Sequence, residues 1–553
     1  MPEASPFRLS TLAAFCLLLL VLLFEEIPPS IWYGAQALTL TFALCEAVLA
    51  QLRAQESRPW FKHWAALPVW QFLGLTLAMM LSACVMAYST TQQAEPLLAV
   101  KSQLKAFLPA YLKDFAAILF FGLVYWNGRR LVNPSASAYG GLLRAFDALI
   151  WIWFCLALLS AAASGNPEIS FSLLRKETGA YLILYMIALE VAHNERHWAA
   201  QVRTLAVLGL LISIVSTVFY YVYGGRIIDP ANLELCDSMR RNGLVYHNTP
   251  YSLDFPWRAV WPTEHPNRLA SLGIILTFTL FFCAATMRKR ELQVLWAICA
   301  AVPAYLICIT QTRGAMIGVA LGLAALFALA CWIIVMHQSR INKALAISLA
   351  LLIGLTAAGG VYVALPQHTK ERIDEVFTAE FWSWLDLENK TLAKQGQGTG
   401  FMRTQAWRGA FMMLEQYPWL GIGHGWERFE EEYILLKMEG KIQDLRENKP
   451  HAHMNLLETT VENGYAAGAA WLLLHLCFFI ALAAAFFRAR DPRRQLLLAI
   501  MLSLQLAIAG FGMTNFSLRY RAGMLIWIAT AWAVAMIRNP EFGIREEIKD
   551  GIE

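Results

Sequence analysis

Charged residues are scarce in this 553-residue chain. Asp, Glu, Lys and Arg make up 15% of it, whereas soluble domains carry about 25%. Apolar residues of the set AVILMFWYC reach 58%, and the mean hydropathy is +0.46. This composition excludes a disordered chain, a coiled coil, a collagen-like chain and an ordinary soluble enzyme. The net charge of +5 is too small to indicate binding of nucleic acid. The composition indicates a polytopic membrane protein.

Cysteine pairs with metal-binding or redox spacing are also missing. All of the ten cysteines except Cys236 lie in apolar runs, and no CxxC motif occurs. A disulfide framework or a cysteine metal site is therefore not expected. The HExxH spacing of zinc hydrolases is absent as well, which leaves packing within a membrane as the role of most cysteines.

Long apolar runs, in contrast, occur along the whole chain. A helix needs about 20 apolar residues to cross the ~30 Å hydrocarbon core. Fourteen runs qualify, and because the fourth and sixth are short we predict an all-α protein with about 12 to 14 transmembrane helices. The first run lacks a small-residue cleavage site, which predicts an uncleaved anchor. The runs are 9–25, 31–50, 67–88, 111–127, 145–163, 179–193, 204–222, 269–287, 292–311, 315–336, 343–364, 465–487, 495–512 and 522–537.

Lys and Arg are distributed unevenly between the loops that connect these runs. Basic residues accumulate in alternate short loops and are sparse in the loops between them. Because basic loops remain on the cytoplasmic side of a membrane, this asymmetry predicts that both termini are cytoplasmic. The basic residues of the inside loops are Arg53, Arg58, Lys62, Arg129, Arg130, Arg144, Arg196, Arg203, Arg288, Lys289, Arg290, Arg340, Lys343, Arg488, Arg490, Arg493 and Arg494.

The remaining polar sequence divides the chain into four regions. Residues 1–222 form N-terminal transmembrane helices, and 223–364 form a second membrane region that starts with an outside loop at 223–268. Residues 365–464 form a large outside loop, and 465–553 hold the last transmembrane helices and a cytoplasmic tail.

The large loop is the only piece long enough to form a small subdomain outside the membrane. Its sequence pattern predicts helices near 401–417 and 425–440, and a third from about 453 into the next span. We therefore expect this loop to be mostly helical.

Few ionisable residues interrupt the apolar runs. Glu46, Asp147 and Glu190 are the main ones, and each lies near the end of a run. We predict that they reach the membrane surface or pair locally. A proton-coupled transporter is expected to hold more acids near the midplane, so a transporter or lipid-glycan flippase is a weaker alternative.

Arginines on the outside are more informative, because positive charge is normally rare there. Arg258 lies just before the eighth span, and Arg313 lies in the tight loop between the ninth and tenth. Arg403 lies within the large loop, and Arg519 and Arg521 lie between the last two spans. Each alone is explained by a lipid headgroup or a surface ion pair. Two or three guanidinium groups that converge could hold a diphosphate at the membrane surface, because arginine offers paired donors to phosphate.

Two histidines stand together in the large loop, in the sequence HAHMNLLETTVENG. His451 and His453 with a following Glu allow a zinc interpretation, but a clear third ligand is missing. Capping of a helix by the pair is a further alternative. The best functional interpretation is a general base, because imidazole titrates near neutral pH and accepts a hydroxyl proton.

The pieces RAVWPTEHPNRLASL, TQTRGAMIG and RTQAWRGAFMMLEQYPWLGIGHGWERF precede the histidine piece in the chain, and the last two of the four are the most specific. In this order, the pieces resemble the O-antigen ligase/polymerase superfamily of bacterial inner-membrane glycosyltransferases, over roughly 255–475. Met454 stands where the family usually has Asn, Ser or Gln, which leaves the acceptor class open. The residues that match the pattern of the two specific pieces are Arg403, Trp407, Pro418, Leu420, Gly421, Gly423, His451, His453, Glu462 and Gly464.

The resemblance implies transfer of a glycan from undecaprenyl diphosphate to an acceptor hydroxyl, with inversion and without a metal or other cofactor. The absence of a DxD motif agrees with this. The resemblance also implies catalytic roles for His453 as the base and for Arg258 and Arg313 as ligands of the diphosphate. The residues expected to bind or orient the substrates are Arg403, His451, Asn267, Glu462 and Arg521.

A ligase that acts on the lipid A-core oligosaccharide at the periplasmic face is the first hypothesis. An O-antigen polymerase and a protein O-oligosaccharyltransferase share the same donor chemistry and stay open. In each case the expected partners are the lipid-linked glycan, its acceptor and membrane lipids, in the bacterial inner membrane.

Overall fold

A computed structural model describes about half of the chain. The first four predicted spans, most of the loop 223–268 and most of the eleventh span lie outside the described residues. These are 140–192, 195–224, 258–259, 263, 266–337, 348, 359, 362–375, 399–442, 451–513, 515 and 520–538.

The structure divides into two compact units. Of the smaller unit, the π-helical turn η3 (Arg175–Gly179), helix α8 (Ala180–Val191), the start of α9 (Glu195–Phe219) and most of α24 (Tyr520–Arg538) are described. Helix α8 has 12 residues and continues η3 without a break in the helical backbone. Together they cover residues 175–191, which include most of the predicted sixth span at 179–193.

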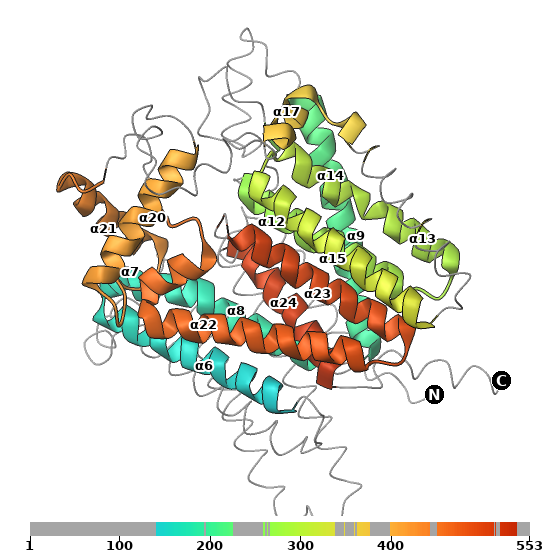
Figure 1. The fold of residues 1–553 in the computed structure, drawn as a ribbon, viewed down its shortest axis with the longest axis horizontal. Helices are drawn as coiled ribbons and strands as arrows, with labels where there is room; N and C mark the ends of the chain where they lie inside the picture. Colours follow the sequence, from blue (N-terminus) through green and yellow to red (C-terminus); the bar gives the residue numbers. More distant parts are fainter. Residues whose placement is uncertain are drawn as a thin grey trace, which may run out of the picture. The chain divides into compact units, whose positions relative to one another are not determined.

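The larger unit is all-helical in its described part, and no strand occurs in any described residue. This confirms the predicted all-α polytopic membrane fold (Figure 1). Seven described helices are long and apolar enough to span a membrane: Gly141–Ala163, Trp198–Val222, Pro266–Thr286, Arg290–Ile309, Arg313–His337, Asn455–Arg488 and Pro492–Gly512. The helices of this unit are α6 (Gly140–Ala163), α7 (Pro167–Leu174), α12 (Pro266–Thr286), α13 (Arg290–Cys299), α14 (Ala301–Ile309), α15 (Arg313–His337), α17 (Gln367–Glu375), α20 (Thr399–Gln416), α21 (Trp426–Met438), α22 (Asn455–Arg488) and α23 (Pro492–Gly512).

One predicted intramembrane charge is found with its partner. Asp147 of α6 forms an ion pair with Arg538 at the end of α24. This confirms the expected local pairing. Glu46 and the side chain of Glu190 lie outside the described part of the chain.

Helices α15 and α23 pack closely along their length, through small residues. A Cβ atom on Gly318 would lie 2.5 Å from the Ala507 carbonyl oxygen, and one on Gly322 would lie 2.7 Å from the Ala507 Cβ. Two glycines four residues apart let helix backbones approach closely in a membrane. The packing brings the N-terminal end of α15 near the C-terminal end of α23, where part of the candidate site lies.

Helices α20 and α21 form a small helical subdomain with the first turns of α22. Phe429, Tyr433 and Val461 are completely or almost completely buried in its core. Burial of one such aromatic ring contributes about 1.5–3 kcal/mol, which explains why so small a unit is ordered. The three helices confirm the predictions of helix near 401–417, near 425–440 and from about 453 onward.

Helix α22 is kinked at Gly464, whose φ of 84° and ψ of 170° are not helical. The chain before α21 supplies the hydrogen bonds that the kink removes. The Ile422 N–H donates to the Val461 carbonyl oxygen at 3.0 Å, and the Tyr465 N–H donates to the Pro418 carbonyl oxygen at 2.9 Å. The kink thus joins the small subdomain to the membrane part of α22, because buried backbone groups require partners.

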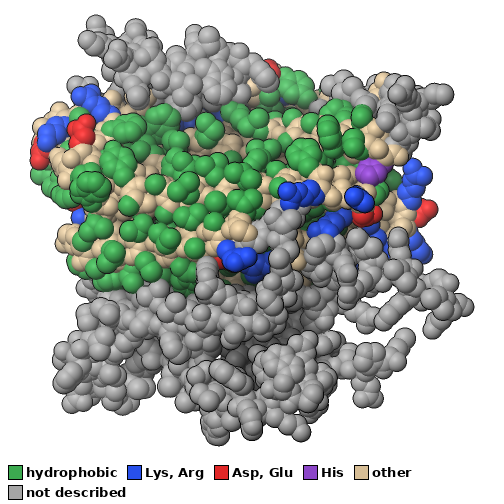
Figure 2. Space-filling model, turned by 60° about the horizontal axis from the view of Figure 1, so that its bottom comes forward, with side chains coloured by type: hydrophobic (Ala, Val, Ile, Leu, Met, Phe, Trp, Pro, Cys, Tyr) green, Lys and Arg blue, Asp and Glu red, His purple; other side chains and the backbone are tan. Residues whose placement is uncertain are grey.

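A broad hydrophobic surface covers the side of the molecule that holds α6 and α22. Figure 2 shows that apolar side chains make up most of the described surface on this face. Exposed apolar area of this extent is typical of a protein that contacts lipid, in agreement with a multi-pass membrane protein.

Candidate functional site

Arg258 is held by the turn between α14 and α15. Its Nε donates to the Thr310 carbonyl oxygen at 2.6 Å, and its Nη2 donates to Thr312 Oγ1 at 3.0 Å. Charge-assisted hydrogen bonds of this kind fix a guanidinium in one orientation. Arg313, the first residue of α15, follows directly after Thr312. Two of the predicted arginines are therefore found at this turn: Arg313 directly follows it, and Arg258 is hydrogen-bonded to it.

Asn267 links this turn by hydrogen bonds to the loop between α23 and α24. Its Oδ1 accepts from Thr312 Oγ1 at 3.1 Å and lies 3.4 Å from Arg258 Nη2. Its Nδ2 donates to Asn515 Oδ1 at 3.0 Å. Asn515 thereby determines which face of the Asn267 amide is turned toward Arg258, because the two amide atoms have opposite hydrogen-bonding roles.

The His-Ala-His turn forms a second group, at the start of α22. Trp407 of α20 donates from Nε1 to the Ala452 carbonyl oxygen at 2.7 Å. The Ala452 N–H donates in turn to the carboxylate of Glu458, which lies in the first turn of α22. His451 Nδ1 accepts from the His453 N–H at 3.2 Å, and the two imidazole rings lie 3.7 Å apart. Three different groups therefore hold this short segment in one conformation.

Backbone strain occurs in both groups. Among the described residues, Gln311 and His453 are the non-glycine residues with positive φ, at 54° and 51°. Such conformations cost of order 1–3 kcal/mol and concentrate at functional sites. One strained residue lies two positions before Arg313, and the other is the predicted base itself.

His453 is neutral at physiological pH. Burial, together with the positive charge of Arg403, lowers the pKa of its imidazole to about 3. The low pKa has two consequences. The ring is available as a proton acceptor, and Arg403 of α20 must lie within electrostatic reach of it.

Replacing Arg403 by glutamine should raise the pKa of His453, because the repulsion between the two cations is removed. The imidazole becomes protonated, and inactive as a base, at a higher pH. The acid limb of the pH–rate profile should therefore move to higher pH, while burial still keeps it below about 6.5. Arg408→Gln, at an exposed position of the same helix, is the control. An acid limb at the same pH in both variants would contradict the assignment.

Glu462 lies at the kink of α22. Its carboxylate Oε2 is 3.6 Å from Nδ1 of the buried His424, and its carbonyl oxygen accepts from Ser160 Oγ at 2.7 Å. His424 Nδ1 also lies 3.2 Å from Asn463 Oδ1. These contacts place Glu462 among residues that support the kink.

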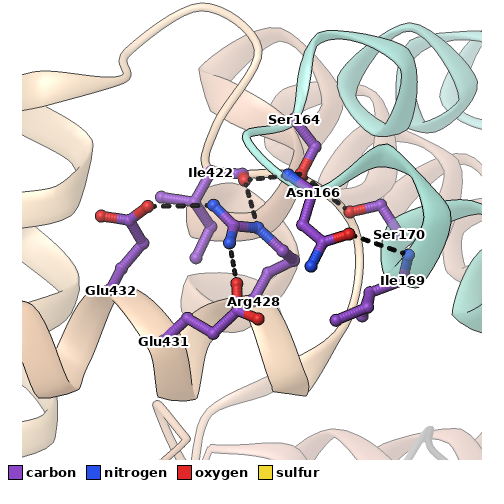
Figure 3. Close-up of polar contacts among 8 residues, drawn as sticks. All are labelled: Ser164, Asn166, Ile169, Ser170, Ile422, Arg428, Glu431 and Glu432. Atoms are coloured by element: carbon purple, nitrogen blue, oxygen red, sulfur yellow. Dashed lines mark hydrogen bonds and ion pairs between the residues drawn. The ribbon is translucent and has the colours of Figure 1, made fainter.

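A buried arginine holds the turn before α21 (Figure 3). Arg428 Nε donates to the Ile422 carbonyl oxygen at 3.3 Å, and the guanidinium pairs with the carboxylates of Glu431 and Glu432. Ser164, at the end of α6, donates to the same carbonyl oxygen at 3.3 Å. A buried charge is stable only when it is paired, and Arg428 accordingly has a structural role.

The predicted residues therefore lie in local groups. Arg258, Asn267 and Arg313 lie at the turn before α15, Arg403, His451 and His453 form another group, and Glu462 supports the kink. The side chain of Arg521 lies outside the described residues. Within the described residues, no cluster of three or more His, Cys, Asp or Glu side chains could hold a metal ion.

Several residues that position these groups are not identified by the sequence alone. Thr312 lies in the piece TQTRGAMIG, which is a signal for its hydroxyl. Asn515 is separated from Asn267 by 248 residues, and no sequence signal connects the two. Trp407 belongs to the family pattern, but its hydrogen bond to the histidine turn depends on the packing of α20.

Comparison with protein families gives one match. Residues 297–472 match the family model described as O-antigen ligase. The matched segment includes Arg313, Arg403 and both histidines of the turn, and begins after Arg258 and Asn267. No curated protein matches the chain. The match over 297–472 supports a relationship of this part of the chain to the O-antigen ligase/polymerase superfamily, which its ordered site residues also resemble.

Proposed function

We propose that the protein transfers a glycan from a polyprenyl diphosphate carrier to an acceptor hydroxyl, and that it is an O-antigen ligase. The observation that carries the proposal is the His-Ala-His turn within the family-matched segment, which holds a neutral imidazole next to Arg403. A neutral imidazole held in one conformation is suited to accept a proton from a hydroxyl group.

Arg258 and Arg313 would act on the donor. The leaving group is a lipid diphosphate, which needs stabilisation of negative charge more than it needs an acid. The hydrogen bonds from Arg258 to Thr310 and Thr312 orient its guanidinium before a substrate arrives, so little reorganisation is required. We expect Arg313, on the same turn, to contribute a second positive charge.

His453 would act on the acceptor. The acceptor oxygen attacks the anomeric carbon and loses its proton to the imidazole, while the bond from that carbon to the diphosphate oxygen breaks. The diphosphate leaves with the bonding electrons, and direct displacement inverts the anomeric centre. His451 would orient His453, because its Nδ1 accepts the His453 backbone N–H.

Donor binding should also adjust the base. The diphosphate brings negative charge toward Arg403, which offsets the repulsion that this arginine exerts on a protonated His453. The pKa of His453 should therefore rise from its low value when the donor is bound. A base with a higher pKa accepts the hydroxyl proton more readily, which couples proton transfer to the presence of the donor.

The proposed location follows from the asymmetry of the basic loops. With both termini in the cytoplasm, the histidine turn faces the periplasm from the inner membrane. The proposed acceptor is a sugar hydroxyl of the lipid A-core oligosaccharide, which is anchored in that same leaflet.

A transfer assay with three acceptors tests the function. Purified protein in nanodiscs receives a polyprenyl-diphosphate-linked glycan together with lipid A-core, with a second copy of the lipid-linked glycan, or with a Ser/Thr-containing peptide. We expect transfer to lipid A-core, at a rate that EDTA does not change. Chain elongation would indicate a polymerase instead, and glycosylated peptide would indicate a protein transferase. Absence of transfer to all three would contradict glycosyl transfer and favour a transporter.

Substitution of Arg258 by lysine should reduce kcat/KM for the lipid-linked donor by about 10²-fold. Lysine keeps the charge but not the paired donors that bind Thr310, Thr312 and the diphosphate. Thr312→Val, which keeps Arg258 but removes the hydroxyl that accepts from Arg258 and donates to Asn267, should cost roughly tenfold. If the lysine variant retained wild-type kcat/KM, a specific role for the guanidinium would be excluded.

A further inference from the structure

An exposed aromatic turn follows α20. Trp419 is 77% exposed, and Tyr417 and Leu420 beside it are also exposed, although the same turn contributes Ile422 to the buried core of the subdomain. A large tryptophan side chain with this exposure has not been buried against the protein. The surface next to Trp419 should therefore indicate what contacts its side chain.

The membrane part of α22 carries a continuous apolar stripe. After the kink, five apolar side chains are exposed at spacings that keep them on one face of the helix. They are Tyr465, Leu472, Leu476, Ile480 and Phe487. The distance from the first to the last is 22 residues, or about 33 Å, close to the ~30 Å thickness of the hydrocarbon core. The stripe therefore matches the lipid-facing surface of a complete span, with Tyr465 at one membrane interface.

Trp419 lies at the same level as Tyr465. The Tyr465 N–H donates to the carbonyl oxygen of Pro418, the residue before Trp419, at 2.9 Å. The backbone of Trp419 is also adjacent to the kink, because a Cβ on Gly464 would lie 2.0 Å from the Trp419 carbonyl oxygen. The turn cannot move along α22 without losing these contacts, so it extends the apolar stripe at its interfacial end.

We infer that the turn Tyr417–Leu420 is a membrane-interface anchor, with the Trp419 ring in the headgroup region of the bilayer. Tryptophan and tyrosine prefer this region because their rings are apolar and their N–H and O–H groups can reach water or headgroups. Continuity with the lipid-facing stripe of α22 identifies lipid as the occupant of this surface. The anchor would hold the small subdomain at a constant height above the membrane.

Site-directed spin labelling in nanodiscs tests the anchor. Nitroxides are placed by Trp419→Cys, Leu476→Cys and Met438→Cys in a background without native cysteines. Leu476 lies in the middle of the stripe and serves as the membrane control. Met438 is 80% exposed at the end of α21, beside the exposed ion pair of Glu439 and Lys441, and serves as the aqueous control. Collisions with oxygen, which partitions into lipid, and with a water-soluble nickel complex report the depth of each label.

We expect the ratio of oxygen to nickel accessibility at position 419 to lie between those of the two controls. A ratio equal to that at position 438 would overturn the inference, because the turn would then be in water. Low accessibility to both reagents would also overturn it, in favour of a contact with another protein or a second copy of this chain.

A second measurement uses the unmodified protein and does not depend on the cysteine-free background. Hydroxyl-radical oxidation followed by mass spectrometry is carried out in nanodiscs. Met438 should oxidise readily, and Trp419 should be protected even though both side chains are highly exposed in the protein structure. Rapid oxidation of Trp419 at a rate matching its exposure would contradict the anchor.

Discussion

Replacement of His453 by alanine is expected to reduce glycan transfer by about 10²–10⁴-fold, the usual contribution of a general base. The imidazole is neutral at physiological pH because burial, together with Arg403, lowers its pKa. In the alanine variant, no imidazole would be present to take up the proton from the hydroxyl group of the glycan acceptor. The rate of transfer to lipid A-core by protein in nanodiscs, at saturating donor, is the measurement.

A glycine variant makes this experiment sharper. His453 has a φ of 51°, which glycine adopts without strain, so His453→Gly should fold at least as well as the wild type. Added imidazole should restore part of the activity of this variant by occupying the space of the missing ring. Equal transfer rates in the wild type and the alanine variant would exclude His453 as the base. Failure of imidazole rescue in a folded glycine variant would favour a positioning role instead.

The Gly464→Ala substitution should produce the largest loss of stability. At a φ of 84°, alanine is strained, and its Cβ would lie 2.0 Å from the Trp419 carbonyl oxygen. Because the nearest atoms belong to the backbone, the turn must move, and the hydrogen bonds at the kink are lost with it. We expect a cost on the order of 3 kcal/mol or more, seen as a lower thermal unfolding temperature in detergent.

The Gly440→Ala variant distinguishes the effect of backbone strain from that of a steric clash. Gly440 also has a positive φ, of 72°, but an added Cβ meets nothing within 4 Å. This variant should lose only about 1–2 kcal/mol. Equal unfolding temperatures for the two variants would show that the close approach of the turn to α22 does not matter for stability.

Much of the fold could be predicted from the sequence because hydrophobic length and periodicity are local properties. The runs at 269–287, 315–336 and 495–512 correspond to α12, α15 and α23 within a few residues. Hydropathy does not reveal the π-helical turn η3 that directly precedes α8, because an α-helix and a π-helix can carry the same side chains.

The candidate site could be predicted only in part, because a sequence pattern shows local relations and not contacts between distant segments. His451 and His453 are neighbours in the chain, and their relation to each other follows from the sequence. The contact between Asn267 and Asn515 depends on how α12, α15 and α23 pack. The supporting role of Glu462 depends on the kink of α22 and on the turn that covers it.

That this protein is helical and crosses a membrane several times follows from its amino-acid sequence, because the free energy of transferring apolar side chains into lipid is a sum over neighbouring residues. The residue types and the order typical of the family are also present in the sequence. The partners that orient Arg258, the neutrality of His453 and the position of Trp419 relative to the α22 span follow from the folded structure. Each of these depends on burial and on contacts between segments that are far apart in the chain, and such contacts form only when the helices pack.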